Sequence, residues 1–217
     1  MTLPAGSVPF NTQLNVTVRA LDSKNTTSAP SAPVATLSAP ANPTVTQVSY
    51  ASGNMTVETT AVKGAVSYVV EAFKLDGTKV ASATSSKTQV TLLPGSVPAN
   101  TPLKILVRAV DLQNSTSAAS PPVAAVSAPA APTGVSGLGG KNKVTISRQP
   151  VAGAASYRVT LSNGMSFVTS STSYTVTGLE TATSYNCIVW AANSAGAQGP
   201  GSAPVAVRTA NIAPLDF

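Results

Sequence analysis

The sequence predicts an all-β protein made of tandem antiparallel β-sandwiches, and three observations support this fold class. Of the 217 residues, 43% are apolar and only 9% are charged, whereas globular chains usually carry about 25% charged residues. Many prolines and glycines punctuate short segments in which apolar and polar residues alternate, and half-buried strands separated by turns have this pattern. The sequence also repeats at an offset of 89 residues, which indicates consecutive copies of one unit.

The repeat predicts one partial unit followed by two whole units. The run GSVPFNTQLNVTVRALD at 6–22 returns as GSVPANTPLKILVRAVD at 95–111, and residues 6–44 match residues 95–133 at 25 of 39 positions. The Pro-rich words SAPANP and SAPAAP mark the joints between units. We therefore expect a partial unit at 1–42, whole units at 43–131 and 132–210, and a C-terminal tail at 211–217.

Alternation of apolar and polar residues predicts the strands of the last unit. We expect strands around 144–148, 157–161, 166–170, 173–177, 185–191 and 203–208. The dipeptide Asn163-Gly164 predicts a tight hairpin turn, as Asp76-Gly77 does in the middle unit. Because no helix follows the glycine-rich run at 137–140, we interpret this run as a loop between the first two strands and not as a phosphate site.

One run of the last unit resembles a known family. GLETATSYNCIVWAANSAG at 178–196 is similar to the E–F corner and F strand of fibronectin type III domains, and the likeness extends more weakly to the middle unit. The resemblance implies that Tyr185 is a corner tyrosine whose hydroxyl bonds to nearby backbone. It also implies that Tyr157 takes the place of an aromatic residue on strand C. The likeness is carried by Leu179, Thr183, Tyr185, Val189, Ala191 and Asn193.

The sequence departs from this family at three core positions. Arg148 and Thr59 stand near the place of the usual Trp on strand B, and Leu103 replaces the corner tyrosine in the middle unit. We expect a core repacked with smaller residues.

The partial unit at 1–42 corresponds to strands E, F and G without A, B, C or C′. Strand E normally pairs with A and B, while F and G pair with C. Leu14, Val16 and Val18 are therefore expected to form a bare apolar face beside unpaired strand edges. Completion by strands of another chain or another copy, or by residues removed from a longer precursor, is one interpretation, and a trimmed start is the other.

The residue types present do not predict catalysis. The chain has no histidine, which removes the commonest general base and most zinc sites. Glu58 and Glu71 are interpreted as able to approach on neighbouring strands, but a strand-surface carboxylate pair lacks the cleft that glycosidase chemistry needs. Cys187 is expected to be a buried, unreactive thiol. We predict no enzyme activity, no catalytic residue, no cofactor and no metal site.

Trp190 is the candidate contact residue of the last unit. Alternation with Val189 and Ala191 points it outward, and an exposed Trp can anchor a partner. In the alternative interpretation, the side chain of Arg158 covers the ring.

The charge pattern and hydropathy restrict the partners. The net charge of +6 is spread along the chain, so no basic stripe predicts nucleic-acid binding. No apolar run approaches the ~20 residues of a membrane span. The opening MTLPAGSVPF lacks the features of a secretory signal, so we expect no export by that route.

These observations favour a structural or display protein over an enzyme. Our first expectation is a bacteriophage virion component, either a head decoration or fibre or a tail appendage. It would lie on the virion surface and contact other virion proteins, copies of itself and host surface glycans. The alternative is an extracellular spacer or binding fragment of a secreted bacterial adhesin or polysaccharide-degrading enzyme. A eukaryotic receptor fragment is a third reading, motivated by Asn-X-Thr sequons at Asn15, Asn25, Asn54 and Asn114.

Overall fold

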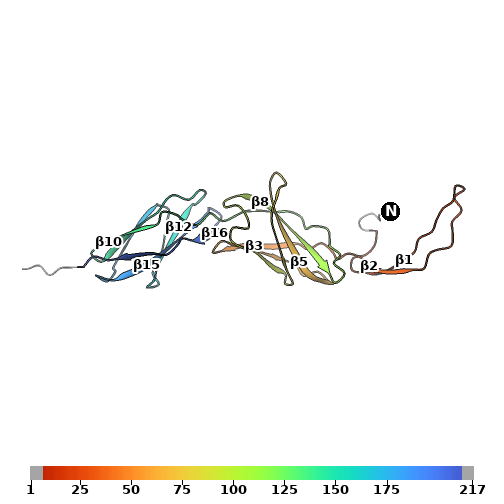
Figure 1. The fold of residues 1–217 in the computed structure, drawn as a ribbon, viewed down its shortest axis with the longest axis horizontal. Helices are drawn as coiled ribbons and strands as arrows, with labels where there is room; N and C mark the ends of the chain where they lie inside the picture. Colours follow the sequence, from red (N-terminus) through yellow and green to blue (C-terminus); the bar gives the residue numbers. More distant parts are fainter. Residues whose placement is uncertain (1–6, 212–217) are drawn as a thin grey trace, which may run out of the picture.

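A computed structural model describes residues 7–211, which form strands and turns without a helix. Three parts follow one another in a row (Figure 1). We call them the ribbon (residues 7–38), the middle sandwich (β3–β9) and the last sandwich (β10–β17). The all-β class predicted from the alternation pattern is confirmed.

The ribbon is a single antiparallel strand pair, β1 (Gln13–Val16) and β2 (Val34–Leu37). Leu14 lies opposite Thr36, and Val16 lies opposite Val34. The strand E that we expected before this pair falls on residues 1–6 and lies outside the described residues.

The middle sandwich has two antiparallel sheets. One has the order β3-β4-β7 and the other β6-β5-β8-β9, which correspond to the A-B-E and C′-C-F-G strand sets expected from the resemblance. The strands are β3 (Val45–Ala51), β4 (Asn54–Thr59), β5 (Ala65–Lys74), β6 (Lys79–Ser85), β7 (Gln89–Leu92), β8 (Pro102–Asp111) and β9 (Val123–Val126).

The last sandwich repeats this arrangement. Its sheets are β10-β11-β14 and β13-β12-β15-β16, and β17 also pairs with β15. The strands are β10 (Ser136–Gly140), β11 (Lys143–Ser147), β12 (Ser156–Leu161), β13 (Ser166–Thr169), β14 (Ser173–Thr177), β15 (Ser184–Ala192), β16 (Gln198–Gly201) and β17 (Val205–Arg208).

Each sandwich encloses its own core, because the inward residues of both sheets meet between them. Met55, Val57 and Leu92 face Val70 and the inward side of β8 in the middle sandwich. The core of the last sandwich contains Val144, Ile146, Tyr157, Val159, Leu161, Val176, Leu179, Tyr185, Cys187, Val189, Ala191 and Val207. Full burial of one such aliphatic side chain contributes about 1.5–3 kcal/mol, so each sandwich is stabilised by its own residues.

The structure shows how the cores accommodate two of the expected departures from the family. Leu103, at the position of the corner tyrosine, is fully buried. Arg148 is also buried, and its guanidinium carbon lies 3.9 Å from the centroid of the Tyr157 ring. One guanidinium nitrogen donates to the Ser171 carbonyl, while Nε and Nη1 have no hydrogen-bond partner. The cationic side chain therefore fills an aromatic-sized space by stacking on Tyr157.

The interpretation of residues 137–140 as a loop is wrong, because these residues lie in β10, the first strand of the last sandwich. A Cβ on Gly139 would overlap the Arg208 carbonyl oxygen, and a Cβ on Gly137 would crowd the Val207 side chain. The glycines allow β10 to approach β17 closely. This requirement comes from a strand distant in sequence, so local glycine content suggested a loop.

Candidate functional site

The joint between the middle and last sandwiches is built from turns of both. Asn100 precedes β8 with φ of 46°, and its side-chain amide lies where a Cβ on Gly153 would be. Gly153 has φ of 72°, so this position requires glycine for its backbone as well as for the contact. Nearby, the Gly53 N–H donates to the Gln198 carbonyl at 3.1 Å. The two sandwiches therefore interlock directly.

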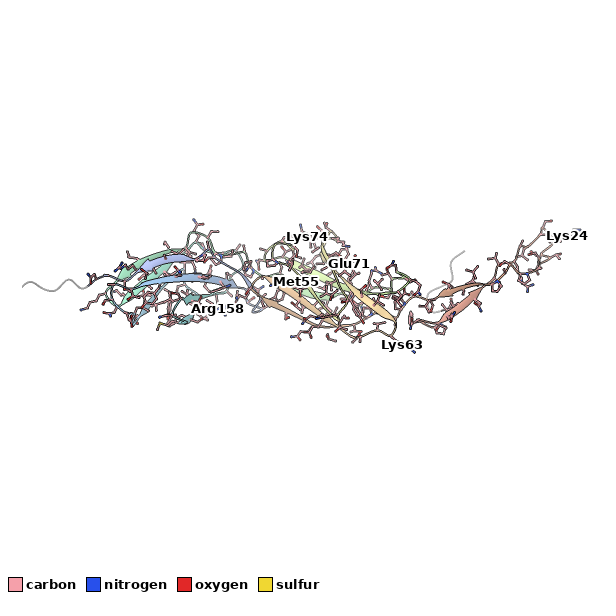
Figure 2. All side chains as sticks on the ribbon, turned by 60° about the horizontal axis from the view of Figure 1, so that its bottom comes forward. Lys24, Met55, Lys63, Glu71, Lys74 and Arg158 are labelled. Atoms are coloured by element: carbon pink, nitrogen blue, oxygen red, sulfur yellow. The ribbon has the colours of Figure 1, made fainter. Side chains whose placement is uncertain are left out.

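The joint between the ribbon and the middle sandwich has the same design. Asn11 has φ of 50°, and its amide lies against Gly64, whose φ is 79°. The second pair repeats the first at the offset of 89 residues, since Asn100 corresponds to Asn11 and Gly153 corresponds to Gly64. The neighbouring Lys63 lies at the end of the middle sandwich that meets the ribbon (Figure 2). Our sequence analysis placed the joints at the Pro-rich words but missed these asparagine–glycine contacts, although both members recur unchanged at the repeat offset.

A tyrosine holds each glycine-bearing loop in place. The Val62 N–H donates to the Tyr68 hydroxyl at 2.8 Å, and the Val151 N–H donates to the Tyr157 hydroxyl at 2.9 Å. Because both rings are buried in their cores, each loop is tied to the sandwich that carries it. The aromatic residue expected on strand C thus also positions the joint.

The turn after strand F forms the other side of each joint. Ala195 of the last sandwich lines a hollow with Pro102 and residues 124–126 of the middle sandwich. One unit earlier, Gln113 lines a hollow with Gln13 and residues 35–37 of the ribbon.

One buried polar atom distinguishes the two joints. Asn193 Oδ1 accepts from the Ala195 and Ala197 N–H groups, and its Nδ2 lies 3.4 Å from the Ser127 carbonyl as a donor. Asp111 makes the equivalent turn, with Oδ1 accepting from the Gln113 and Ser115 N–H groups. Its other oxygen, Oδ2, is buried without a partner, and a carboxylate oxygen can only accept a hydrogen bond, whereas an amide nitrogen donates.

The ribbon exposes an apolar strand face whose equivalent in the middle sandwich is buried in the core. Val16 is 44% exposed and Val18 is 69% exposed, whereas their equivalents Ile105 and Val107 are 0% exposed. Leu14 is partly exposed, and its equivalent Leu103 is fully buried. Among the described parts of the chain, this is the place where an apolar strand face lacks a covering sheet.

The remaining predicted residues lie in the last sandwich. The Tyr185 hydroxyl accepts from the Glu180 N–H at 3.2 Å, which is the geometry of a tyrosine corner. Trp190 is half-buried, and the Arg158 guanidinium carbon lies 4.7 Å from the centroid of its ring. The two residues are also cross-strand neighbours. The structure therefore covers one face of Trp190 with Arg158.

The carboxylates that we considered for catalysis do not come together. Glu58 lies on β4 and Glu71 lies on β5, in different sheets. Glu58 accepts from Gln89, while Glu71 forms ion pairs with Lys79 and Arg108. Alternation along a strand reveals which side chains share a face but not which sheet the strand joins, and the expected proximity was wrong for this reason.

Cys187 is the buried, unreactive thiol that the alternation predicts. It is fully buried in the last core, and this burial raises its thiol pKa to about 11 despite the nearby Arg148. Such a thiol stays protonated and weakly nucleophilic at neutral pH.

Within residues 7–211, no helix is long and apolar enough to cross a membrane. Nor do three or more metal-ligating side chains gather anywhere in this range.

Taken together, the fold and the joints define a class of protein, namely a tandem β-sandwich protein that acts as a structural or binding module. Residues 130–208 match the family model of the fibronectin type III domain, so this part of the chain supports the resemblance noted in the sequence. Domains of this type are generally non-catalytic binding or structural modules.

Solved structures provide a second comparison. The crystal structure of the chicken CNTN1 FN1–FN3 domains aligns with 89% of this chain and 76% of its own, at 19% identity and a TM-score of 0.43. Comparison with curated protein sequences gave no match.

Proposed function

We propose that this protein is a non-enzymatic rod whose sandwiches hold a binding or docking surface at a fixed distance from an attachment point. The observation that carries this proposal is the recurrence of one joint, in which an asparagine amide fits against a glycine of the next unit at both 11/64 and 100/153. A flexible tether would need no such contact, and its linkers would be polar and free of buried partners.

The setting that we propose is the surface of a bacteriophage virion, as a head decoration or fibre or as a tail appendage. The supporting features are stability without disulfides, from two separate cores, and a surface with few charges. Other virion proteins or copies of this chain would hold one end. The last sandwich would project, with host surface glycans as its proposed target.

Mass spectrometry of purified virions from the encoding phage or lysogen tests this setting. We expect the chain among the particle proteins, and immunogold labelling should mark the particle exterior. Its absence from virions together with its presence in culture supernatant would contradict the virion setting. That result would favour the second candidate, a spacer in a secreted adhesin or polysaccharide-degrading enzyme, which also uses rows of joined sandwiches.

The glycan proposal has its own test at Trp190. Arg158→Ala would uncover the ring, since the guanidinium stacks on it, and aromatic faces are the usual platforms for apolar sugar faces. On a glycan array, binding that appears or strengthens in this variant and is lost in Trp190→Ala would support the proposal. If neither variant bound any glycan on the array, the glycan proposal would be contradicted.

A further inference from the structure

One row of side chains crosses the outer face of the last sandwich, on the sheet that contains β15. Arg158, which is labelled on this sandwich in Figure 2, is the cross-strand neighbour of Val168 on one side and of Trp190 on the other. Trp190 in turn lies opposite Gly201 of β16. These four residues stand beside one another on four neighbouring strands, and we call them the outer row.

The outer row combines an aromatic ring, a cation and an apolar side chain. A Cβ at position 201 would lie 2.9 Å from Trp190 Nε1, so glycine leaves the space in which the indole ring lies. The Arg158 guanidinium carbon is 4.7 Å from the centroid of this ring. On the other side of Arg158, Val168 is 69% exposed. An aromatic face and an apolar side chain therefore flank the guanidinium.

The Arg158 guanidinium lacks an acceptor. Its Nε is buried without a hydrogen-bond partner, and within residues 7–211 no carboxylate forms an ion pair with it. Glu180 is the single carboxylate of residues 132–211, and it lines a hollow with Ser184 at the start of β15, whereas Trp190 lies near the end of this strand. A buried donor without an acceptor indicates a ligand that accepts hydrogen bonds.

The middle sandwich neutralises the equivalent face by itself. Its corresponding cross-strand pair is Val69 and Arg108, and Arg108 Nε lies 3.3 Å from Glu71 Oε2. Arg108 also donates to the Ser117 carbonyl at 3.1 Å. In the last sandwich, Thr160 occupies the position of Glu71 at the repeat offset, so this carboxylate is missing. Because residues 132–211 contain five basic residues and one acidic residue, charge complementarity favours an anionic ligand.

We propose that the outer row binds a carboxylate-bearing sugar, namely a uronic acid or a sialic acid of a surface glycan. The apolar face of the sugar ring stacks on Trp190, and its carboxylate accepts hydrogen bonds from the Arg158 guanidinium. Val168 contacts the next sugar of the glycan. This inference rests on the proposed function, in which the last sandwich meets host surface glycans, and it names the class of sugar.

Binding exchanges one partner of Arg158 for another. In the free protein the guanidinium lies over the Trp190 ring. A guanidinium matches a carboxylate with two parallel hydrogen bonds, and this pairing is stronger than a cation–π contact at an exposed site. The carboxylate therefore draws Arg158 off the ring and frees the ring for stacking. A neutral sugar has to uncover the ring without this gain, so it binds more weakly.

The experiment compares acidic oligosaccharides with their own methyl esters on the full chain. The probes are an oligogalacturonate and an oligosialic acid, which distinguish the two sources of the carboxylate. Trp190 is the one tryptophan of the chain, so tryptophan fluorescence reports on this site alone. We expect a saturable fluorescence change with at least one acid, and binding of its methyl ester at least about tenfold weaker.

Variants assign the preference to Arg158. Arg158→Ala should weaken binding of the acid at least about tenfold, while the ester should bind as well as before or more tightly, because the ring is uncovered. Arg158→Lys keeps the charge but loses the planar fork, and should weaken binding of the acid several-fold. Lys143→Ala is the matched control, because it removes one charge from the other sheet and should stay within about twofold. Calorimetry with Trp190→Ala should show loss of both acid and ester.

Three outcomes would overturn the inference. The first is that neither acid binds. The second is that acid and ester bind equally and Arg158→Ala does not distinguish them, which would leave the glycan proposal standing but exclude a carboxylate ligand. The third is that Lys143→Ala weakens binding as much as Arg158→Ala, because the attraction would then be a general effect of positive charge. None of these outcomes affects the search for the chain in virions.

Discussion

At the residue scale, Asp111 shows how one side chain can make two similar joints unequal. Its Oδ2 is buried without a partner, whereas Asn193 places an Nδ2 donor near the Ser127 carbonyl in the same turn one unit later. A buried polar atom without a hydrogen bond is costly, because it has lost water and gained nothing in return.

The first prediction follows from this comparison. Asp111→Asn should raise the free energy of unfolding of the middle sandwich by about 1 kcal/mol, since a neutral amide costs less to bury without a partner than a charged carboxylate does. Urea unfolding monitored by fluorescence gives the change. The matched control is Asp22→Asn, because the same turn in the ribbon is exposed and should show no change. A loss of stability in Asp111→Asn would contradict this account of the joint.

A pH dependence is predicted from Glu71. The hydrogen bond from Lys79, followed by its charge and by Arg108, lowers the pKa of Glu71 below its ordinary value of 4.5. A carboxyl with a lowered folded-state pKa stabilises the fold fully above its unfolded pKa and loses that contribution as pH falls through the folded value. The middle sandwich should therefore lose stability as the pH falls below about 4.5.

Urea midpoints between pH 7 and pH 3 measure this effect in the wild type and in Glu71→Gln. The variant should show a smaller decrease over this range, because position 71 no longer titrates. The difference should be modest, since Lys79 is half exposed and exposed ion pairs contribute at most about 1 kcal/mol. Equal pH slopes for the two proteins would show that Glu71 does not contribute.

The asparagines of two sequons also have a residue-scale explanation. Asn25 and Asn114 adopt φ of 61° and 60°, and asparagine tolerates this left-handed region better than most residues. Their N–H groups donate to the Asp22 and Asp111 carbonyls within the turn after strand F. The backbone of the turn accounts for these asparagines without a glycan.

At the element scale, β10 demonstrates a strand that forms despite its composition. Its two central glycines pack against β17, where larger residues would collide. The strand is held by antiparallel pairing with β11, in which Gly137 lies opposite Ile146 and Gly139 opposite Val144.

We therefore predict that Gly139→Ala destabilises the last sandwich by roughly 1–3 kcal/mol, because the new Cβ would overlap the Arg208 carbonyl. Leu138→Ala is the control on the same strand, as Leu138 is 74% exposed and its loss should be small. Thermal unfolding of the two variants provides the comparison. A Gly139→Ala protein as stable as the control would mean that β10 can move away from β17 freely.

The strands also show which structural features the alternation pattern can predict and which it cannot. The inward positions of β11, β12 and β15 followed from alternation, and the structure buries them. The pattern could not reveal that β10 approaches β17, nor that Glu58 and Glu71 belong to different sheets. Both facts depend on which strands become neighbours, and alternation within one strand carries no information about that.

At the scale of the whole molecule, the joints determine whether the row of sandwiches is stiff. Gly153→Ala should disrupt the joint between the two sandwiches, because the added Cβ would overlap Asn100. Small-angle scattering should then show a wider distribution of molecular dimensions than in the wild type.

Gly164→Ala is the matched control for this variant. Gly164 has φ of 88°, close to the 72° of Gly153, but no atom lies within 4 Å of its would-be Cβ. Both variants therefore carry backbone strain in the last sandwich, and only Gly153→Ala should alter the scattering. The second change Asn100→Gly should restore it in part. Identical scattering from all these proteins would contradict the rigid joint.

The sequence alone determined the fold class, the repeat and the inward face of the clearly alternating strands, because alternation and turn residues are local properties of the chain. The tertiary structure decided how successive units lock together, that Arg158 covers Trp190, and how far the ribbon face stays open. These features arise where residues distant in sequence meet, so they depend on which surfaces come into contact.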